Sequence, residues 1–241
     1  MSKKKKLQNE QEVEKQKYDS LDSKLKNLTE RQKQFIEIGL NPNTNVFFIK
    51  GSAGTSKTYL SVYCALKLLN SKSINKIIFI RTPVESTEHK MGHLPGDLDE
   101  KFNNYAAPFF DKLEEFVHEE KILAMKKSEK IQIMPINFLR GRQFDNSVII
   151  ADECQNFTSY ELKTLLTRIG YNSKIFLCGD ITQSDLKNSL KNDFEKVINI
   201  FKEFQESIDM GINFFEFTDD EIVRSEIVKY IVKVFKSLES K

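Results

Sequence analysis

The chain has 241 residues, 39% of them hydrophobic, which suits one α/β domain with a substantial core. Its 37 basic and 35 acidic residues leave a net charge of only +2, so overall charge points to no partner and any basic binding surface must be local. No apolar stretch approaches the roughly 20 residues that span a membrane, and no apolar run follows the basic start as in a secretory signal. We therefore expect a cytoplasmic protein without membrane contact.

The chain opens with a polar segment. Residues 1–27 are rich in Lys, Gln, Glu and Ser, which predicts a disordered or loosely helical tail. The basic run 3–6 is read either as solvated or as a contact for nucleic acid, and such runs are usually solvated. Residues 28–241 form the predicted domain. It begins with a helix that has Thr29 as its N-cap and ends at Asn41-Pro42-Asn43.

Short apolar strands then alternate with helical stretches, without an internal repeat. This order predicts a buried, mainly parallel sheet with helices on both faces. The sparse cysteines, Cys64, Cys154 and Cys178, adjoin apolar runs, which favours buried thiols over a disulfide framework or a zinc site. We predict strands at Val46–Lys50, Lys76–Arg81, Ile131–Pro135, Ser147–Ala151, 174–178 and 213–217, and helices at Lys57–Asn70, 97–120 with a kink near Pro108, 159–169, 186–206 and 225–238.

A segment of small residues between the first strand and the following helix predicts a phosphate-binding loop. Small residues let backbone N–H groups converge on phosphate oxygens, and the helix N-terminus adds its positive end. We expect Lys57 to bind the β- and γ-phosphates of a nucleotide and the Thr58 hydroxyl to bind Mg²⁺. Ser56 departs from the glycine of the usual GxxxxGK[ST] pattern, where the backbone bends tightly. The loop reads Gly51, Ser52, Ala53, Gly54, Thr55, Ser56, Lys57 and Thr58.

Polar residues at the ends of two later strands complete the predicted site. The strand Ser147–Ala151 is followed by Asp152 and Glu153. Ionised acids are costly in a core, so we expect them in a cleft at the carboxyl end of the sheet. Asp152 would hold Mg²⁺, and Glu153 would orient and deprotonate the attacking water. Gln183, after the next strand, is the candidate γ-phosphate sensor. Solvent-facing acids and an ordinary polar loop are the alternatives.

Several segments together, in their order, resemble the PhoH-like ATPase family, which is related to the core of superfamily 1 helicases. The resemblance covers nearly the whole chain beyond the tail, and its lack of an added domain is similar to phage-type minimal members. Ser56 and Cys154 replace the usual glycine and alanine. The matching segments are Gly51 to Thr58, Arg81-Thr82-Pro83-Val84-Glu85, Gly92-His93-Leu94-Pro95-Gly96-Asp97-Leu98, Phe138-Leu139-Arg140-Gly141-Arg142, Asp152-Glu153-Cys154-Gln155-Asn156, Gly179-Asp180-Ile181-Thr182-Gln183-Ser184-Asp185-Leu186 and Ile222-Val223-Arg224.

The resemblance implies a RecA-like P-loop ATPase core that uses ATP and Mg²⁺. It also implies a homo-oligomeric ring, with a hexamer favoured, and action on RNA or single-stranded nucleic acid. Gln32 matches a glutamine that recognises adenine; a solvent-facing helix residue is its alternative. Arg224, and after it Arg142, match arginines suited to neutralise transition-state charge from a neighbouring subunit. Surface salt bridges are the alternative for both, and a bacterial cell or a phage-infected host is the implied setting.

The polar segment 82–96 is long for a connection within a compact domain, which indicates a functional or disordered loop. Because it follows a strand on the ligand-binding side of an open sheet, we interpret it as a nucleic-acid or ring-pore loop. His89 and His93 lack an evident third ligand, so metal binding is disfavoured.

Three functions remain open from the sequence. The first is ATP hydrolysis coupled to binding or remodelling of RNA or single-stranded nucleic acid. The second is a P-loop ATPase that switches or remodels protein partners in a phosphate-starvation or stress-linked process. The third is a nucleotide-binding assembly module in which Ser56 has weakened hydrolysis. Glu153 and Gln183 favour hydrolysis over the third function.

Overall fold

A computed structural model describes residues 21–25, 27–82, 98–184 and 192–221, together with single helical positions at 227, 230, 231 and 234. Within these residues, no helix is long and apolar enough to cross a membrane. Most of the predicted tail, most of the loop 82–96, residues 186–191 and most of the predicted last helix lie outside the described residues.

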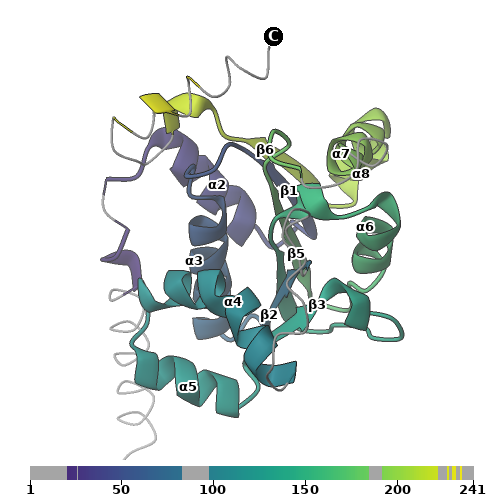
Figure 1. Ribbon diagram of the computed structural model, residues 1–241. Helices are drawn as coiled ribbons and strands as arrows, with labels where there is room; N and C mark the ends of the chain where they lie inside the picture. The colour runs from purple at the N-terminus through teal and green to yellow at the C-terminus, as the bar shows by residue number, and fades with distance from the viewer. Residues whose placement is uncertain are drawn as a thin grey trace, which may run out of the picture.

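The centre of the fold is a six-stranded sheet in the order β3-β2-β4-β5-β1-β6 (Figure 1). All its pairings are parallel, so the carboxyl ends of all six strands lie at one edge. The sheet is therefore the parallel sheet of an α/β fold with helices on both faces, as predicted. The strands are β1 (Val46–Lys50), β2 (Lys76–Arg81), β3 (Ile131–Pro135), β4 (Ser147–Ala151), β5 (Lys174–Gly179) and β6 (Ile212–Glu216).

Helices cover both faces of the sheet (Figure 1). Short 3-10 turns follow β3 and β4, at 136–138 and 154–156, and another lies at 219–221. One face carries α2 (Glu30–Leu40), α3 (Lys57–Asn70), α4 (Leu98–Glu114) and α5 (Glu119–Lys127), and the other carries α6 (Ser159–Leu166), α7 (Asp193–Glu203) and α8 (Glu206–Asp209).

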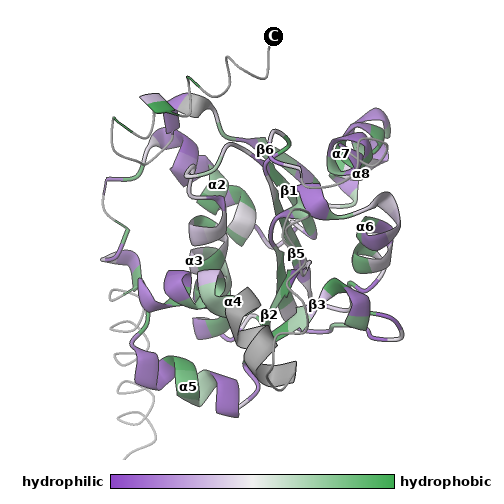
Figure 2. Ribbon diagram, in the orientation of Figure 1, coloured by the Kyte–Doolittle hydropathy of each residue, from purple (hydrophilic) through white to green (hydrophobic). Residues whose placement is uncertain are grey.

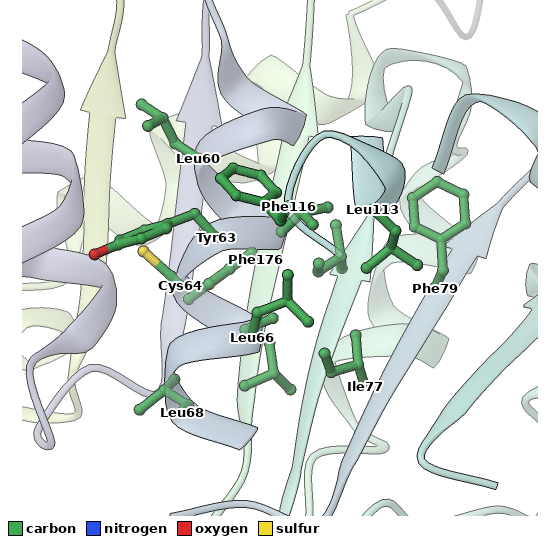
Figure 3. Close-up of a cluster of buried hydrophobic side chains, with 14 of the residues drawn as sticks. Leu60, Tyr63, Cys64, Leu66, Leu68, Ile77, Phe79, Leu113, Phe116 and Phe176 are labelled. Carbon is green, nitrogen blue, oxygen red and sulfur yellow. The ribbon is translucent and has the colours of Figure 1, made fainter. Parts of the chain in front are cut away.

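The sheet separates two apolar clusters, because its strands bury side chains on both faces. Helix α3 packs between the sheet and its neighbours, with Leu60 and Cys64 fully buried (Figure 3). Phe79 of β2 stacks on Phe109 of α4 at a ring distance of 4.4 Å. Each such side chain contributes about 1.5–3 kcal/mol on burial. Hydrophilic residues line the outward faces of helices such as α5 and α7 (Figure 2).

Several predicted helix ends differ from those in the structure. The helical region predicted at 97–120 is two helices; α4 continues through Pro108, and the break comes after Glu114. Helix α6 ends at Leu166, because Ile169 forms a parallel β-bridge with Phe144 instead of a further helical turn. In the described part of 186–206, α7 ends at Glu203 and a separate helix α8 follows.

The end of the predicted tail packs against α3. Leu21 is 3% exposed and joins the core cluster of that face. Asp22 accepts hydrogen bonds from the Tyr63 hydroxyl and the Lys67 ammonium, both at 2.6 Å. Residues 21–25 are thus in contact with the domain, although their polar composition predicted that they belong to the tail.

The three cysteines are free and buried, as predicted. Burial raises the pKa of the Cys178 thiol to about 12, with the nearby Asp152 carboxylate adding to the shift. Cys178 also lies 3.3 Å from the hydroxyl of Ser61. These thiols therefore stay protonated at neutral pH and act as packing residues.

Candidate functional site

The segment between β1 and α3 is a tight loop with two left-handed backbone positions. Gly54 has φ +88° and Ser56 has φ +66°. A non-glycine residue in the left-handed region costs about 1–2 kcal/mol. Serine therefore occupies the glycine position of the motif in the conformation that glycine adopts most easily, and the chain tolerates the strain.

Side chains of the loop fold back onto its own carbonyls. The Lys57 ammonium donates to the carbonyl oxygens of Gly51 at 2.6 Å and Ser52 at 3.0 Å. The Thr55 hydroxyl donates to Ser52 as well, at 2.8 Å. A Cβ atom on Gly51 would come within 2.8 Å of the Thr55 hydroxyl and 2.9 Å of Phe217, so only glycine fits there. The result is a compact loop whose carbonyls hold the ammonium of the buried Lys57.

The second strand end meets this loop directly. The Thr58 hydroxyl donates a hydrogen bond to Oδ1 of Asp152 at 2.9 Å. Asp152 is 7% exposed, and burial, with the adjacent Glu153 carboxylate, raises its pKa against the opposing effects of Arg81, Thr58 and Lys57. A hydroxyl and a carboxylate side by side are the hard oxygen ligands that Mg²⁺ prefers.

These two oxygens fit a magnesium site completed by phosphate and water. Among the described residues there is no group of three or more His, Cys, Asp or Glu residues placed to hold a metal. Mg²⁺ in nucleotide sites needs no such cage, since one or two carboxylates and substrate phosphates suffice. Thr58 and Asp152 are therefore the residues that would hold it.

Glu153 is fixed by two donors and by its backbone. The Arg81 guanidinium lies 3.3 Å from its Oε1, and the Gln155 amide donates to its Oε2 at 2.6 Å. Its φ of +55° places it in the left-handed region, where strain is typical of functional sites. The side chain is 36% exposed, so the carboxylate is held and still accessible.

The end of β5 contributes the third part of the site. Asp180 is 5% exposed and accepts the backbone N–H of Ala53 in the phosphate loop at 2.8 Å. Its own N–H donates to the Gln155 side chain at 2.9 Å. Gln183 follows in the turn, with its N–H bonded to the Asp180 carbonyl at 3.1 Å. The turn that carries Gln183 is thus anchored on Asp180, which is itself bonded to the phosphate loop and to Gln155.

These residues line one pocket with a volume of about 720 Å³. It lies at the carboxyl edge of the sheet, where open α/β sheets bind ligands. Of the predicted site residues, the pocket brings together Gln32, Ala53, Gly54, Ser56, Lys57, Thr58, Asp152, Glu153 and Gln183. The volume falls in the range of small-molecule sites.

Gln32 lies at the N-terminus of α2 and is 6% exposed. Its Oε1 accepts the Thr29 backbone N–H at 3.1 Å, and its own N–H donates to the Thr29 hydroxyl, which is a capping box. The cap uses the carbonyl oxygen, and the amide NH₂ is left to donate to an acceptor in the pocket. Gln32 is therefore a buried pocket residue and not a solvent-facing helix residue.

The two predicted arginines, Arg142 and Arg224, are not found in the nucleotide pocket of the described residues. Arg142 is exposed and is not among the residues that line the pocket of its own chain. Arg224, His89 and His93 lie outside the described residues. The site as described therefore holds no arginine finger, and the two arginines stay predictions.

Three further residues of the site were missed from the sequence. Arg81 pairs with Glu153, Gln155 joins Glu153 to Asp180, and Asp180 binds the phosphate loop. All three stand at or just after strand ends, inside segments that resemble the family. Their position at or just after the ends of parallel strands is the signal that could have identified them.

Comparison with known proteins identifies a family model and relatives that match most of the chain. A family model described as PhoH-like protein matches residues 24–236. The PhoH-like protein of Synechocystis is 36% identical over 212 residues, 88% of this chain and 62% of the relative. That of Bacillus subtilis is 36% identical over 204 residues, 85% and 61%. The chain spans about three fifths of the length of these relatives.

Solved structures of low similarity also match. The SWI2/SNF2 ATPase core of Sulfolobus solfataricus in complex with dsDNA has a TM-score of 0.46 at 15% identity, covering 82% of this chain and 46% of that one. The Pif1 helicase of Candida albicans has a TM-score of 0.38 at 16% identity, covering 80% and 40%. The family match rests on sequence and spans most of the chain, and the chain belongs to the PhoH-like family.

Proposed function

We propose that the protein hydrolyses ATP with Mg²⁺ and couples hydrolysis to binding or remodelling of RNA or single-stranded nucleic acid. The observation that carries the ATPase half is the 2.9 Å hydrogen bond between Thr58 and Asp152. It joins the phosphate loop to the acidic strand end inside one pocket, with Lys57 and Glu153 beside it. A helix N-terminus, a lysine, two hard oxygens and a general base are the parts that phosphoryl transfer to water needs.

Each residue has a defined task. Lys57 binds the β- and γ-phosphates, and backbone N–H groups of the loop bind their oxygens. Mg²⁺, when bound, neutralises charge on the phosphates. Glu153 accepts a proton from the attacking water and orients it, and the donors Arg81 and Gln155 keep the carboxylate in place. Gln183 senses the γ-phosphate, and Gln32 donates to the adenine.

We place the active form in a ring, with a hexamer favoured. Arg142 is exposed and does not line its own pocket, which supports action across a subunit boundary. Arg224 is the first candidate for that role, from its match to the family. We propose that the protein works in the cytoplasm of a bacterial cell or a phage-infected host, and relatives in several bacteria support this.

The nucleic-acid half is tested by measuring ATP turnover alone and with single-stranded RNA, single-stranded DNA and duplex of matched sequence. We expect a single-stranded polymer to stimulate turnover. Turnover that none of the polymers changes removes the nucleic-acid half and favours the second function, an ATPase acting on protein partners. Nucleotide binding without turnover, in the presence of Mg²⁺ and every polymer, leaves only the nucleotide-binding module.

A further inference from the structure

A second hollow lies on the opposite face of the sheet from α3, between α6 and the turn that follows β3. Its volume is about 390 Å³. We call it the basic groove, because its side chains include three cations, two threonines and a tyrosine. It is lined by Arg140, Gly141, Tyr160, Lys163, Thr164, Thr167 and Arg168.

The charge of the basic groove is unbalanced. No carboxylate lines it, and no ion pair joins Arg140, Lys163 or Arg168 to a carboxylate in the part of the chain that the structure describes. The whole chain has 37 basic and 35 acidic residues, so such a group of unneutralised cations is a local concentration of positive charge. A local basic surface of this kind attracts polyanions.

The basic groove also contains one aromatic side chain, Tyr160, among its three cations. Tyr160 is 62% exposed, on the first turn of α6. The Arg140 guanidinium lies 5.6 Å from its ring centroid and donates to its hydroxyl at 3.1 Å. Contact with Arg140 holds the ring while most of its surface stays in solvent. A held, exposed ring flanked by cations is the arrangement on which single-stranded bases stack.

The groove has a fixed far end. Arg168 donates to the Arg142 carbonyl at 3.3 Å and to the Thr167 hydroxyl at 3.1 Å, which ties the turn after β3 to the end of α6. From Tyr160 to Thr167 the helical rise is about 10 Å. That length takes a stacked base and its flanking phosphates, while a duplex would keep its bases stacked away from Tyr160.

We propose that the basic groove binds single-stranded nucleic acid, with a base stacked on Tyr160 and phosphates on Lys163 and Arg140. This inference rests on the proposed function and assigns the surface that would perform its nucleic-acid half. Single-stranded binding needs only stacking and charge, so the groove selects single strands over duplex and is tolerant of sequence.

The same segment connects the basic groove to the nucleotide pocket. Glu153 lies seven residues before Tyr160, and only the 154–156 turn and the Thr158 cap separate them. The start of α6 is anchored, since Asp193 accepts both the N–H and the hydroxyl of Ser159 at 2.9 and 2.6 Å. A nucleic-acid strand bound at Tyr160 would therefore contact the same short segment that carries Glu153, the proposed general base.

The test measures binding of a labelled oligouridine to the full chain by fluorescence anisotropy, across a range of salt concentrations. We expect Tyr160→Ala to weaken binding about tenfold and Tyr160→Phe to change it less than about twofold, because phenylalanine keeps the stacking face. Lys163→Ala should lower the slope of log affinity against log salt by about 0.7, the value for one phosphate contact on a single strand. All three variants should keep basal ATP turnover and the wild-type melting temperature.

Two control variants match these changes outside the groove. Tyr171 is 81% exposed and Lys127 is exposed, and neither lines the groove. Tyr171→Ala and Lys127→Ala should bind the oligouridine as the wild type does. Wild-type binding that Tyr160→Ala and Lys163→Ala leave unchanged would overturn the groove assignment and leave the proposed function standing. A wild-type chain that binds no single-stranded RNA or DNA overturns the nucleic-acid function itself, and the inference with it.

Discussion

The Thr58 hydroxyl, in the first turn of α3, donates to Oδ1 of Asp152, just after β4, at 2.9 Å, although the two residues lie 94 positions apart. The contact fixes the relative position of the two oxygens that we assign to Mg²⁺. Thr58→Val keeps the shape and removes the oxygen, so it should raise the Mg²⁺ concentration needed for half-maximal turnover by at least about tenfold. Thr58→Ser keeps the hydroxyl and should stay near wild type. Equal Mg²⁺ dependence of the Val and Ser variants would contradict the assignment.

Glu153→Gln should keep ATP binding and lose turnover by about 10²–10⁴-fold, because the amide cannot accept the proton of the attacking water. Binding is measured by equilibrium titration with labelled ATP, and turnover by phosphate release. Glu115 also lines the pocket, away from the strand ends, so Glu115→Gln is a matched control with expected wild-type turnover. Turnover retained by Glu153→Gln removes Glu153 as the base.

Ser56→Gly should stabilise the protein by about 1 kcal/mol, since it relieves a non-glycine residue at φ +66°. Urea unfolding of the nucleotide-free protein measures the change. Ser52 is in the same loop, and its φ is not positive, so Ser52→Gly should bring no gain. A loss of stability in Ser56→Gly would show that the serine side chain contributes more than the strain costs.

Gln32 allows its cap and its adenine contact to be separated. Glutamate completes a capping box as well as glutamine does, so Gln32→Glu should keep the stability of α2. It has no NH₂ donor, however, and should lose the preference for ATP over GTP. Gln32→Ala should lose both. A Gln32→Glu variant that still prefers ATP, measured by competition between the two nucleotides, would remove Gln32 from adenine recognition.

Lys174 predicts a pH dependence of stability. It is 8% exposed and donates to the carbonyls of Asn41 and Thr44, and burial lowers its pKa from 10.5 to about 8. Between these values the unfolded chain binds more protons than the folded chain, so this contribution to stability grows as pH rises from about 8 to 10.5. The full change is about 3 kcal/mol.

The measurement compares urea unfolding of the wild type and Lys174→Met at pH 8 and at higher pH. Taking the difference removes the opposite effect of the buried thiols, whose raised pKa values lower stability in the same range. The wild type should gain on the variant as pH rises. A difference that does not vary with pH would contradict the lowered pKa of Lys174.

The strands and the phosphate loop could be predicted because their signals are local. Four or more consecutive apolar residues identify β1, β2 and β4, and the small residues after β1 identify the loop. Helix ends depend on residues distant in the sequence: α6 ends before Ile169, because Ile169 forms a β-bridge with Phe144. The sequence around Leu21 is polar, and its burial comes from the apolar cluster on the α3 face, which local sequence does not reveal.

The same limit applied to the sites. Asp152 and Glu153 were found from their place after an apolar strand, but no local pattern pairs Glu153 with Arg81, 72 positions away. In the basic groove Arg140 contacts Tyr160, although the two residues are 20 positions apart and β4 lies between them in the sequence. Such contacts follow from the order of strands in the sheet, which periodicity does not encode.

Gln155 has a consequence for how the nucleotide pocket can move. Its amide donates to Glu153, its side-chain oxygen accepts the N–H of Asp180, and its carbonyl accepts the hydroxyl of Ser184. The residue is 2% exposed, so breaking these bonds would leave buried polar groups unpaired. The ends of β4 and β5 therefore shift together, and the bonds of Thr58 to Asp152 and of Ala53 to Asp180 extend this coupling to the phosphate loop.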